Sequence, residues 1–129
     1  MSISAIAEMH KMSDSGEILA LESEAWSCVL DDKQSLVWEV KSEEEGVQFS
    51  LNTYTWFDGE IGRDNGTFSK NCYWGKNCNT LSFTADINKA NLCGYSDWRL
   101  PSLDELNTIV DYYGESDTLI DTDFFPNTQ

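Results

Sequence analysis

Apolar residues alternate with polar ones in the first third of the chain and recur at helical spacing in the last third. The alternation predicts β-strands at residues 26–30 and 36–41, separated by a polar turn at 31–34. The alternating apolar positions of the second strand are Leu36, Trp38 and Val40. Because successive side chains of a strand point to opposite faces, these three are expected to share one face and to pack in the core.

The helical spacing begins at residue 80. We expect a helix that begins with Thr80 as its N-cap and ends at Asn91. Phe83, Ile87 and Ala90 share one face of this helix.

A second helix is expected directly after Pro101. Ser102 and Glu105 have the spacing of a capping box, in which each side chain accepts a hydrogen bond from an amide at the helix end. An apolar stripe follows, and Gly114 is expected to end the helix. The stripe consists of Leu103, Leu106, Ile109 and Val110.

Residues 53–79 separate the strands from the helices and are rich in Asn, Gly, Thr and aromatic residues. The Asn65-Gly66 pair predicts a tight turn. A loop of this length in a compact domain is usually functional or held by a covalent link. The length of the chain is enough for one domain with a single core.

The chain has 129 residues and a net charge of −15, from 23 acidic and 8 basic residues. The basic residues are scattered singly, so the surface is expected to repel nucleic acids and sulfated polymers. No apolar run is long enough to cross a bilayer. Residues 1–17 are expected to be a lead segment without a signal peptide, because they lack a basic start and an apolar stretch.

The four cysteines are Cys28, Cys72, Cys78 and Cys93. Four cysteines allow three disulfide connectivities, and spacing alone does not choose among them. Zinc is the alternative, but the spacing of Cys72 and Cys78 is wider than in structural zinc sites. Disulfides are therefore favoured, and they imply an oxidising compartment.

Little in the sequence indicates catalysis. His10 is the only histidine, and a serine or cysteine nucleophile needs a nearby base. We therefore expect no enzyme and no cofactor. Calcium is the alternative, because Asp117, Asp121 and Asp123 lie close together in the sequence. Their spacing does not fit an EF-hand, so exposed loop acids are the favoured interpretation.

The segment from Cys93 to Leu106 is the most distinctive part of the chain, since it joins a cysteine, a turn glycine, Trp98-Arg99-Leu100-Pro101 and the capping box. Arg99 is expected to be structural, with its guanidinium between aromatic rings and paired with a carboxylate. A ligand-contacting arginine is the alternative.

Together these motifs resemble the Lcl C-terminal domain family, which is named after the C-terminal domain of a bacterial collagen-like adhesin. The resemblance covers residues 18–129, which we expect to form the domain. The motifs that carry it are Trp26-Ser27-Cys28-Val29, Leu36-Val37-Trp38-Glu39-Val40-Lys41, Tyr54-Thr55-Trp56, Cys72 with Cys78, Leu92-Cys93-Gly94, Asp97-Trp98-Arg99-Leu100-Pro101, Glu105-Leu106, Ile120-Asp121 and Phe125-Pro126-Asn127-Thr128.

The resemblance implies a C-type-lectin-like α+β domain with two helices and a small antiparallel sheet. It also implies an exported protein, located outside the cell, on the cell surface or in the periplasm. The function expected is a non-enzymatic binding or adhesion module for a glycan or protein ligand. Trp56 and Trp74 are the candidates for stacking on a sugar. The alternatives are an assembly subunit and, ranked lower, a catalyst similar to formylglycine-generating enzymes.

Family members usually continue beyond Phe125-Pro126-Asn127-Thr128 with a Tyr-Trp-Ser-Ser run and further strands. The sheet is therefore expected to be incomplete and to expose an edge, which favours self-association or completion by another chain. Residues 3–12 are one candidate for a substitute strand. We further predict that Cys72 pairs with Cys78 across a short loop, and that Cys28 pairs with Cys93.

Overall fold

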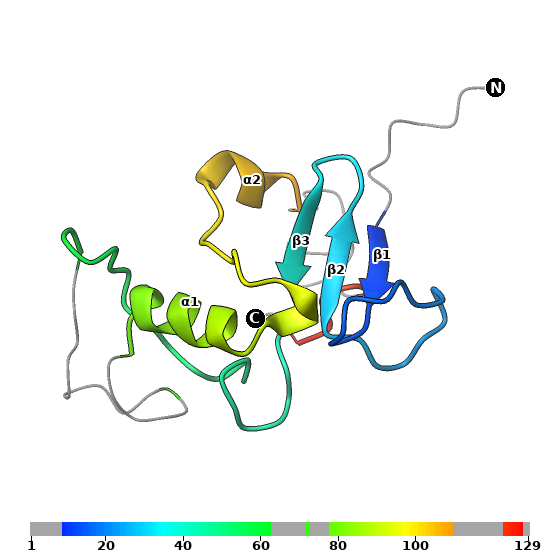
Figure 1. Ribbon diagram of the computed structural model, residues 1–129, viewed down its shortest axis with the longest axis horizontal. Helices are drawn as coiled ribbons and strands as arrows, with labels where there is room; N and C mark the ends of the chain where they lie inside the picture. Colours follow the sequence, from blue (N-terminus) through cyan, green and yellow to red (C-terminus); the bar gives the residue numbers. More distant parts are fainter. Residues whose placement is uncertain (1–8, 63–71, 73–77, 110–122, 128–129) are drawn as a thin grey trace.

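The computed structural model describes residues 9–62, 72, 78–109 and 123–127. Its described elements form a small α+β fold, as expected from the sequence (Figure 1). Three antiparallel strands lie in the order β1-β2-β3. The elements are β1 (Met9–Met12), β2 (Cys28–Asp31), β3 (Leu36–Glu39), α1 (Thr80–Lys89), a 3-10 turn (Leu92–Gly94) and α2 (Leu103–Asn107).

The β2–β3 hairpin confirms the two strands that alternation predicts, with slightly different ends. Its turn is held by Asp31, whose Oδ1 accepts hydrogen bonds from the amides of Lys33 (3.1 Å) and Gln34 (3.2 Å). An aspartate that bonds the backbone two residues ahead is a common way to fix a tight turn. The strand β1 comes from the lead segment and pairs with β2, so β2 is the central strand of the sheet.

The sheet buries apolar side chains on both faces, because neighbouring residues of a strand point in opposite directions. The first core cluster contains Met12, Cys28, Ile87, Leu92 and Cys93, with Leu30, Val37, Val47, Phe83 and Trp98 packed against it. The second contains Val29, Val40, Ile109 and Phe125, with Met9, Trp26, Trp38 and Phe124 against it. Trp38 and Val40 thus share one face, as their alternation predicts.

The segment 123–127 covers the second face of the sheet. The indole Nε1 of Trp26 donates to the carbonyl of Phe124 (2.8 Å), and the Asn127 side chain donates to the carbonyl of Lys41 (3.0 Å). Phe125 is buried between these two anchors. The segment is therefore fixed at the end of β3 by hydrogen bonds as well as by packing.

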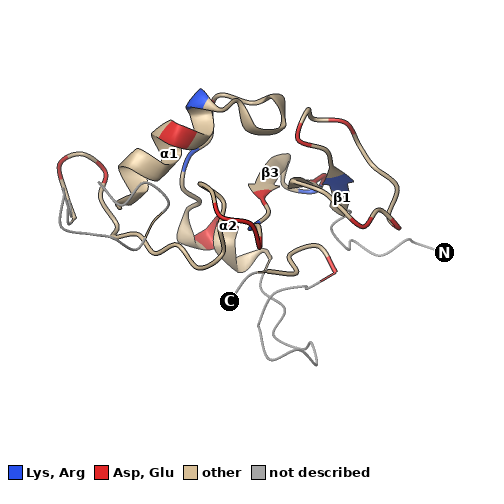
Figure 2. Cartoon of the chain, turned by 90° about the horizontal axis from the view of Figure 1, so that it is seen from below, with Lys and Arg blue, Asp and Glu red and all other residues tan. Residues whose placement is uncertain are grey.

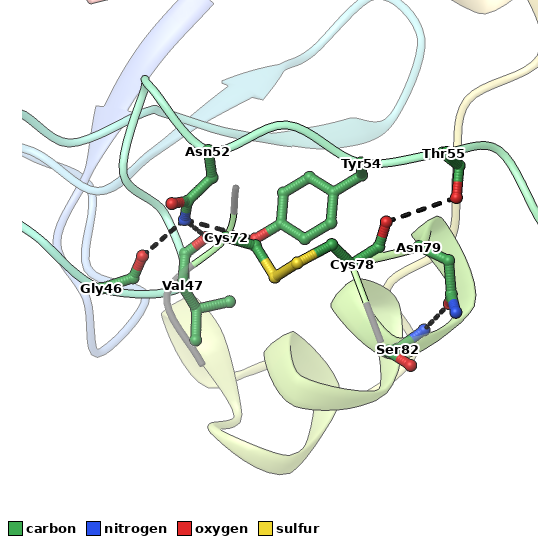
Figure 3. Close-up of a disulfide and its surroundings, with 9 residues drawn as sticks. All are labelled: Gly46, Val47, Asn52, Tyr54, Thr55, Cys72, Cys78, Asn79 and Ser82. Carbon is green, nitrogen blue, oxygen red and sulfur yellow. Dashed lines mark hydrogen bonds between the residues drawn. A yellow bond between two sulfur atoms is a disulfide. The ribbon is translucent and has the colours of Figure 1, made fainter. Parts of the chain in front are cut away.

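Both predicted disulfides are confirmed. Cys28 pairs with Cys93, which links β2 to the 3-10 turn after α1. Cys72 pairs with Cys78 just before α1, beside the Tyr54 ring (Figure 3). The side chains of Cys28 and Cys93 lie within the first core cluster, so this link also fixes the position of α1 on the sheet.

The backbone around Cys93 is tightly folded. Asn91 (φ 54°), Cys93 (φ 54°) and Gly94 (φ 82°) all adopt left-handed conformations. Asn91 tolerates this geometry better than most residues, which explains why α1 ends just before it, as predicted. Gly16 packs against this turn so closely that a Cβ there would lie 2.6 Å from the Cys93 carbonyl oxygen.

The N-cap of α1 was assigned to the wrong residue by the sequence pattern. Asn79 has the extended backbone of a cap, and its Oδ1 accepts from the Ser82 amide (2.8 Å). The Thr80 hydroxyl instead donates to the Phe57 carbonyl (2.9 Å) and accepts from the Phe57 amide (2.9 Å). Asn79 therefore caps the helix, while Thr80 holds the preceding loop against it.

The second helix is shorter than predicted. The capping box at Ser102 is present, but α2 ends at Asn107, and the Thr108 hydroxyl donates to the Glu105 carbonyl (2.6 Å). Leu103 is 74% exposed and Leu106 is 43% exposed, so the predicted stripe is not buried as a whole. A helix of five residues is too short to bury a full face, and Ile109 reaches the core only after the helix ends. Val110 and Gly114 lie outside the described residues.

We expect the two disulfides to differ in their effect on stability. A disulfide lowers the entropy of the unfolded chain, and this effect grows with the number of residues in the loop that it closes. The sequence separation is 65 residues for Cys28–Cys93 and 6 for Cys72–Cys78. Replacing the first pair with alanines should lower the free energy of unfolding by about 4 kcal/mol, and replacing the second by about 2 kcal/mol. Urea unfolding of the two double variants measures this difference. Equal losses would show that the length of the closed loop does not set the stabilisation by these disulfides.

Candidate functional site

A pocket of about 570 Å³ lies between β3, the two helices and the segment 95–101. Its aromatic and aliphatic lining consists of Leu36, Val37, Trp38, Phe83, Ile87, Tyr95, Trp98, Leu100, Pro101, Leu106, Ile109 and Phe125. Its polar lining consists of Ser35, Glu39, Lys41, Thr84, Asp97, Arg99 and Glu105. The distinctive Trp-Arg-Leu-Pro motif therefore forms part of the pocket wall.

The wall at Trp98 is tied to α1 by the side chain of Asn88. The Trp98 amide donates to Asn88 Oδ1 (2.6 Å), and Asn88 Nδ2 donates to the Trp98 carbonyl (3.0 Å). The Trp98 indole donates to the Leu92 carbonyl (3.0 Å), and its ring meets Tyr95 edge to face, with centroids 6.3 Å apart. Asn88 was missed by sequence reasoning, because an amide on a helix gives no sign of the segment that it binds.

Arg99 has the predicted carboxylate partner but not the predicted burial. Its Nη1 and Nη2 each donate to one oxygen of Glu105, both at 2.7 Å. The guanidinium side chain is 61% exposed, so the expectation of a buried group between aromatic rings is wrong. Arg99 faces solvent, and its two charge-assisted hydrogen bonds to Glu105 orient it without burial.

Glu105 serves the ion pair and the helix cap at once. Its Oε1 accepts from the Ser102 amide (2.8 Å), and its own amide donates to the Ser102 hydroxyl (3.1 Å). Hydrogen bonds from Arg99, followed by those from Ser102, lower the pKa of Glu105 to about 2. The same carboxylate therefore fixes the start of α2 relative to the Arg99–Pro101 wall.

Glu39 and Lys41 are two of the charged residues that line the pocket. Their side chains make an ion pair with Nζ to Oε1 at 2.7 Å, and the Lys41 ammonium lies 4.4 Å from the centre of the Phe83 ring. The other carboxylate oxygen of Glu39 is buried and has no hydrogen-bond partner among the described residues. Burial raises the pKa of Glu39, and the charge of Lys41 opposes that rise. Neither residue was singled out from the sequence as a site.

Trp56, one of the two sugar-stacking candidates, does not line the pocket. Trp56 is 53% exposed on a separate loop and is not part of the lining, while Trp74 lies outside the described residues. Asp117 and Asp121 also lie outside them, and Asp123 is exposed. Within residues 9–62, 72, 78–109 and 123–127, no three His, Cys, Asp or Glu side chains cluster as metal ligands do.

The surface charge and the disulfides describe the environment in which the site works. Acidic residues occur on several loops and on both helices (Figure 2), in line with the net charge of −15. No helix in the described part of the chain is long and apolar enough to cross a membrane. Two disulfides are typical of domains that fold in an oxidising environment outside the cytoplasm.

The ionised form of Glu105 should stabilise the fold in a pH-dependent way. A carboxyl whose pKa falls on folding stabilises the fold above its unfolded value, here 4.5, and loses that effect as the pH falls through about 2. Glu105→Gln should therefore be less stable than the parent at pH 7, and the difference should shrink between pH 4.5 and 2.

Urea midpoints across that range test this expectation, with Glu44→Gln as the control because Glu44 is exposed in a loop. A stability difference that does not change with pH would show that the charge of Glu105 does not stabilise the fold.

Comparison with known proteins places the chain in a family. A sequence model described as the Lcl C-terminal domain matches residues 27–129. No curated protein and no solved structure gave a significant match. The matched range includes both disulfides, β2, β3, both helices and every residue that lines the pocket. Since the match covers well over half of its length, the chain belongs to the Lcl C-terminal domain family.

Proposed function

We propose that this chain is a non-enzymatic binding module of an exported bacterial protein and that its pocket holds the end of a glycan. Family membership associates the chain with extracellular, adhesin-related domains. The observation that carries the proposal is the pocket itself. Its volume of about 570 Å³ and its mainly apolar lining with a few polar groups match the usual properties of small-ligand sites.

The lining suits a sugar because it combines aromatic rings with hydrogen-bonding groups. Tyr95 and Trp98 meet edge to face, and the Glu39–Lys41 ion pair also lines the pocket. Aromatic rings bind the C–H faces of sugars, and charged groups bind hydroxyls. The wall is held by Asn88 before any ligand arrives, so little ordering is needed on binding.

The disulfides and the histidine support a binding role over a catalytic one. All four cysteines are in disulfides, so a thiol-dependent reaction like that of formylglycine-generating enzymes has no free thiol here. His10 Nε2 lies 2.9 Å from Asp32 Oδ2 and is not part of the pocket lining. No cofactor is invoked, and calcium remains the alternative. The C-type-lectin-like topology stays a prediction from the family.

The pocket should be needed for binding, and the exposed Trp56 should not. Tyr95→Ala removes an aromatic wall residue that is 40% exposed, so the fold should survive. Loss of one aromatic contact of about 1 kcal/mol should weaken binding roughly five- to tenfold. The matched control is Trp56→Ala, which removes an exposed ring outside the lining.

A glycan array probed with the parent and both variants, with calcium and with a chelator, measures this. The proposal fails if no glycan is bound, or if Trp56→Ala abolishes binding and Tyr95→Ala does not. Binding that disappears with the chelator would establish the calcium alternative.

An assembly role is the second candidate, and the exposed leucines of α2 favour it. Leu103 is 74% exposed and Leu106 is 43% exposed, and their spacing of three residues places them on one side of α2. Exposed apolar side chains that lie together mark contact surfaces. Leu103→Glu adds a charge to an already acidic chain and should oppose self-association.

Sedimentation across a concentration series should show dimers for the parent and a shift toward monomer for Leu103→Glu. A parent chain that stays monomeric at every concentration would exclude self-association through this surface.

A further inference from the structure

We infer that the glycan end held by the pocket is an amino sugar and that Asp97 binds its ammonium group. The inference deepens the proposed function and rests on it. It names the chemical class of the ligand and one accessible side chain that selects it.

The charges of the pocket lining leave one carboxylate unmatched. The charged residues of the lining are Glu39, Lys41, Asp97, Arg99 and Glu105. Lys41 forms an ion pair with Glu39, and Arg99 forms one with Glu105. Asp97 has no ion pair or hydrogen bond among the residues that the structure describes. The described lining therefore carries a net negative charge, and that charge belongs to Asp97.

Asp97 is accessible to a ligand. It is exposed, and it lies in the segment between the 3-10 turn and α2 that lines the pocket. Glu39 differs in this respect, because one of its carboxylate oxygens is buried and the other is bonded to Lys41. Of the carboxylates in the described lining, Asp97 is thus the one that a ligand reaches without displacing a protein partner.

The lining supplies an aromatic ring as well as a carboxylate. Tyr95 is 40% exposed and lines the pocket together with Asp97. An ammonium is attracted to the face of an aromatic ring as well as to a carboxylate. The Lys41 ammonium has both partners in this pocket, since it lies 2.7 Å from Glu39 Oε1 and 4.4 Å from the centre of the Phe83 ring. Asp97 and Tyr95 offer the same two kinds of partner to the ammonium of a ligand.

Arg99 also lines the pocket, and its positive charge is matched by Glu105. Its Nη1 and Nη2 donate to the two oxygens of Glu105 at 2.7 Å, and Nη1 also donates to the Leu100 carbonyl (3.2 Å). Hydrogen bonds from Arg99, followed by those from Ser102, hold the pKa of Glu105 at about 2, so this carboxylate is ionised at neutral pH.

An anionic sugar would therefore compete with Glu105 for Arg99. The N–H groups of Arg99 that these bonds do not use suit a neutral sugar hydroxyl. Arg99 thus contributes to binding an amino sugar through the hydroxyls of the sugar, while Asp97 binds the charge.

The charge of the whole chain favours the same class of ligand. A net charge of −15 attracts cations to the surface and repels anions. A sulfated or carboxylated sugar would meet this repulsion and the carboxylate of Asp97 together. A neutral sugar gains nothing from the charge. An amino sugar gains from both the long-range field and the contact with Asp97, and salt should weaken this gain.

The test is an NMR titration of the full chain with two pairs of methyl glycosides at about pH 6, where the amine is protonated. The pairs are methyl glucosaminide with methyl glucoside and methyl galactosaminide with methyl galactoside. The members of a pair differ only in an ammonium or a hydroxyl at one carbon. At least one amino sugar should bind about fivefold more tightly than its hydroxyl counterpart. The difference should shrink at about 1 M salt.

A variant of Asp97 provides an independent check. Asp97→Asn should weaken binding of the preferred amino sugar about fivefold and leave binding of its hydroxyl counterpart unchanged. The matched control is Asp104→Asn, which makes the same charge change at an exposed position outside the lining and should bind as the parent does. Thermal unfolding establishes that each variant is folded. If Asp97→Asn does not fold, the paired glycosides on the parent chain still decide the question.

Three outcomes would overturn the inference. They are amino sugars that bind no more tightly than their hydroxyl counterparts, an Asp97→Asn variant that keeps the preference, and an Asp104→Asn variant that loses as much as Asp97→Asn. The proposed function stands after any of these if the glycan array still shows binding that depends on Tyr95. An array without binding overturns the proposed function itself.

Discussion

The Cys28–Cys93 disulfide holds the central strand of the sheet against the turn that follows α1. Both cysteines are buried in one core cluster with Ile87 and Leu92, so the covalent link and the packing of α1 act at the same place. Tyr95, the first residue of the pocket wall, directly follows this turn. Its position relative to β3 is therefore set by the core, and the site depends on the link although no cysteine lines it.

Four of the five charged residues that line the pocket form two pairs with different roles. Arg99 and Glu105 make a bidentate pair that is largely exposed, and Glu105 also caps α2. An exposed pair contributes little to stability by itself, but this one fixes the angle between the wall and the helix. Glu39 and Lys41 are more deeply placed, and one oxygen of Glu39 is without a partner among the described residues. The first pair fixes α2 to the wall, and in the second the charge of Lys41 offsets part of the cost of burying Glu39.

Sequence patterns predicted the features that depend on near neighbours. Alternation at residues 36–40 gave β3, the Ser102 and Glu105 spacing gave the capping box, and the turn-forming Asn91 gave the end of α1. Features that depend on distant segments were missed. Nothing near Asn88 indicates that its amide binds Trp98, and nothing in the pattern of β3 indicates that a carboxylate oxygen of Glu39 is buried. The burial expected for Arg99 was wrong for the same reason, because exposure is set by what lies over a residue in space.

The central claim is that the pocket wall is part of the same cooperative unit as the sheet, and native-state hydrogen exchange of the Trp98 amide tests it most directly. This amide donates to Asn88 Oδ1 at 2.6 Å. The account predicts that it exchanges only through global unfolding, with the same free energy of opening as the β2 amides of Val29 and Leu30. Exchange of Trp98 through a local opening of much lower free energy, while β2 stays protected, would contradict the claim that the core holds the wall in place.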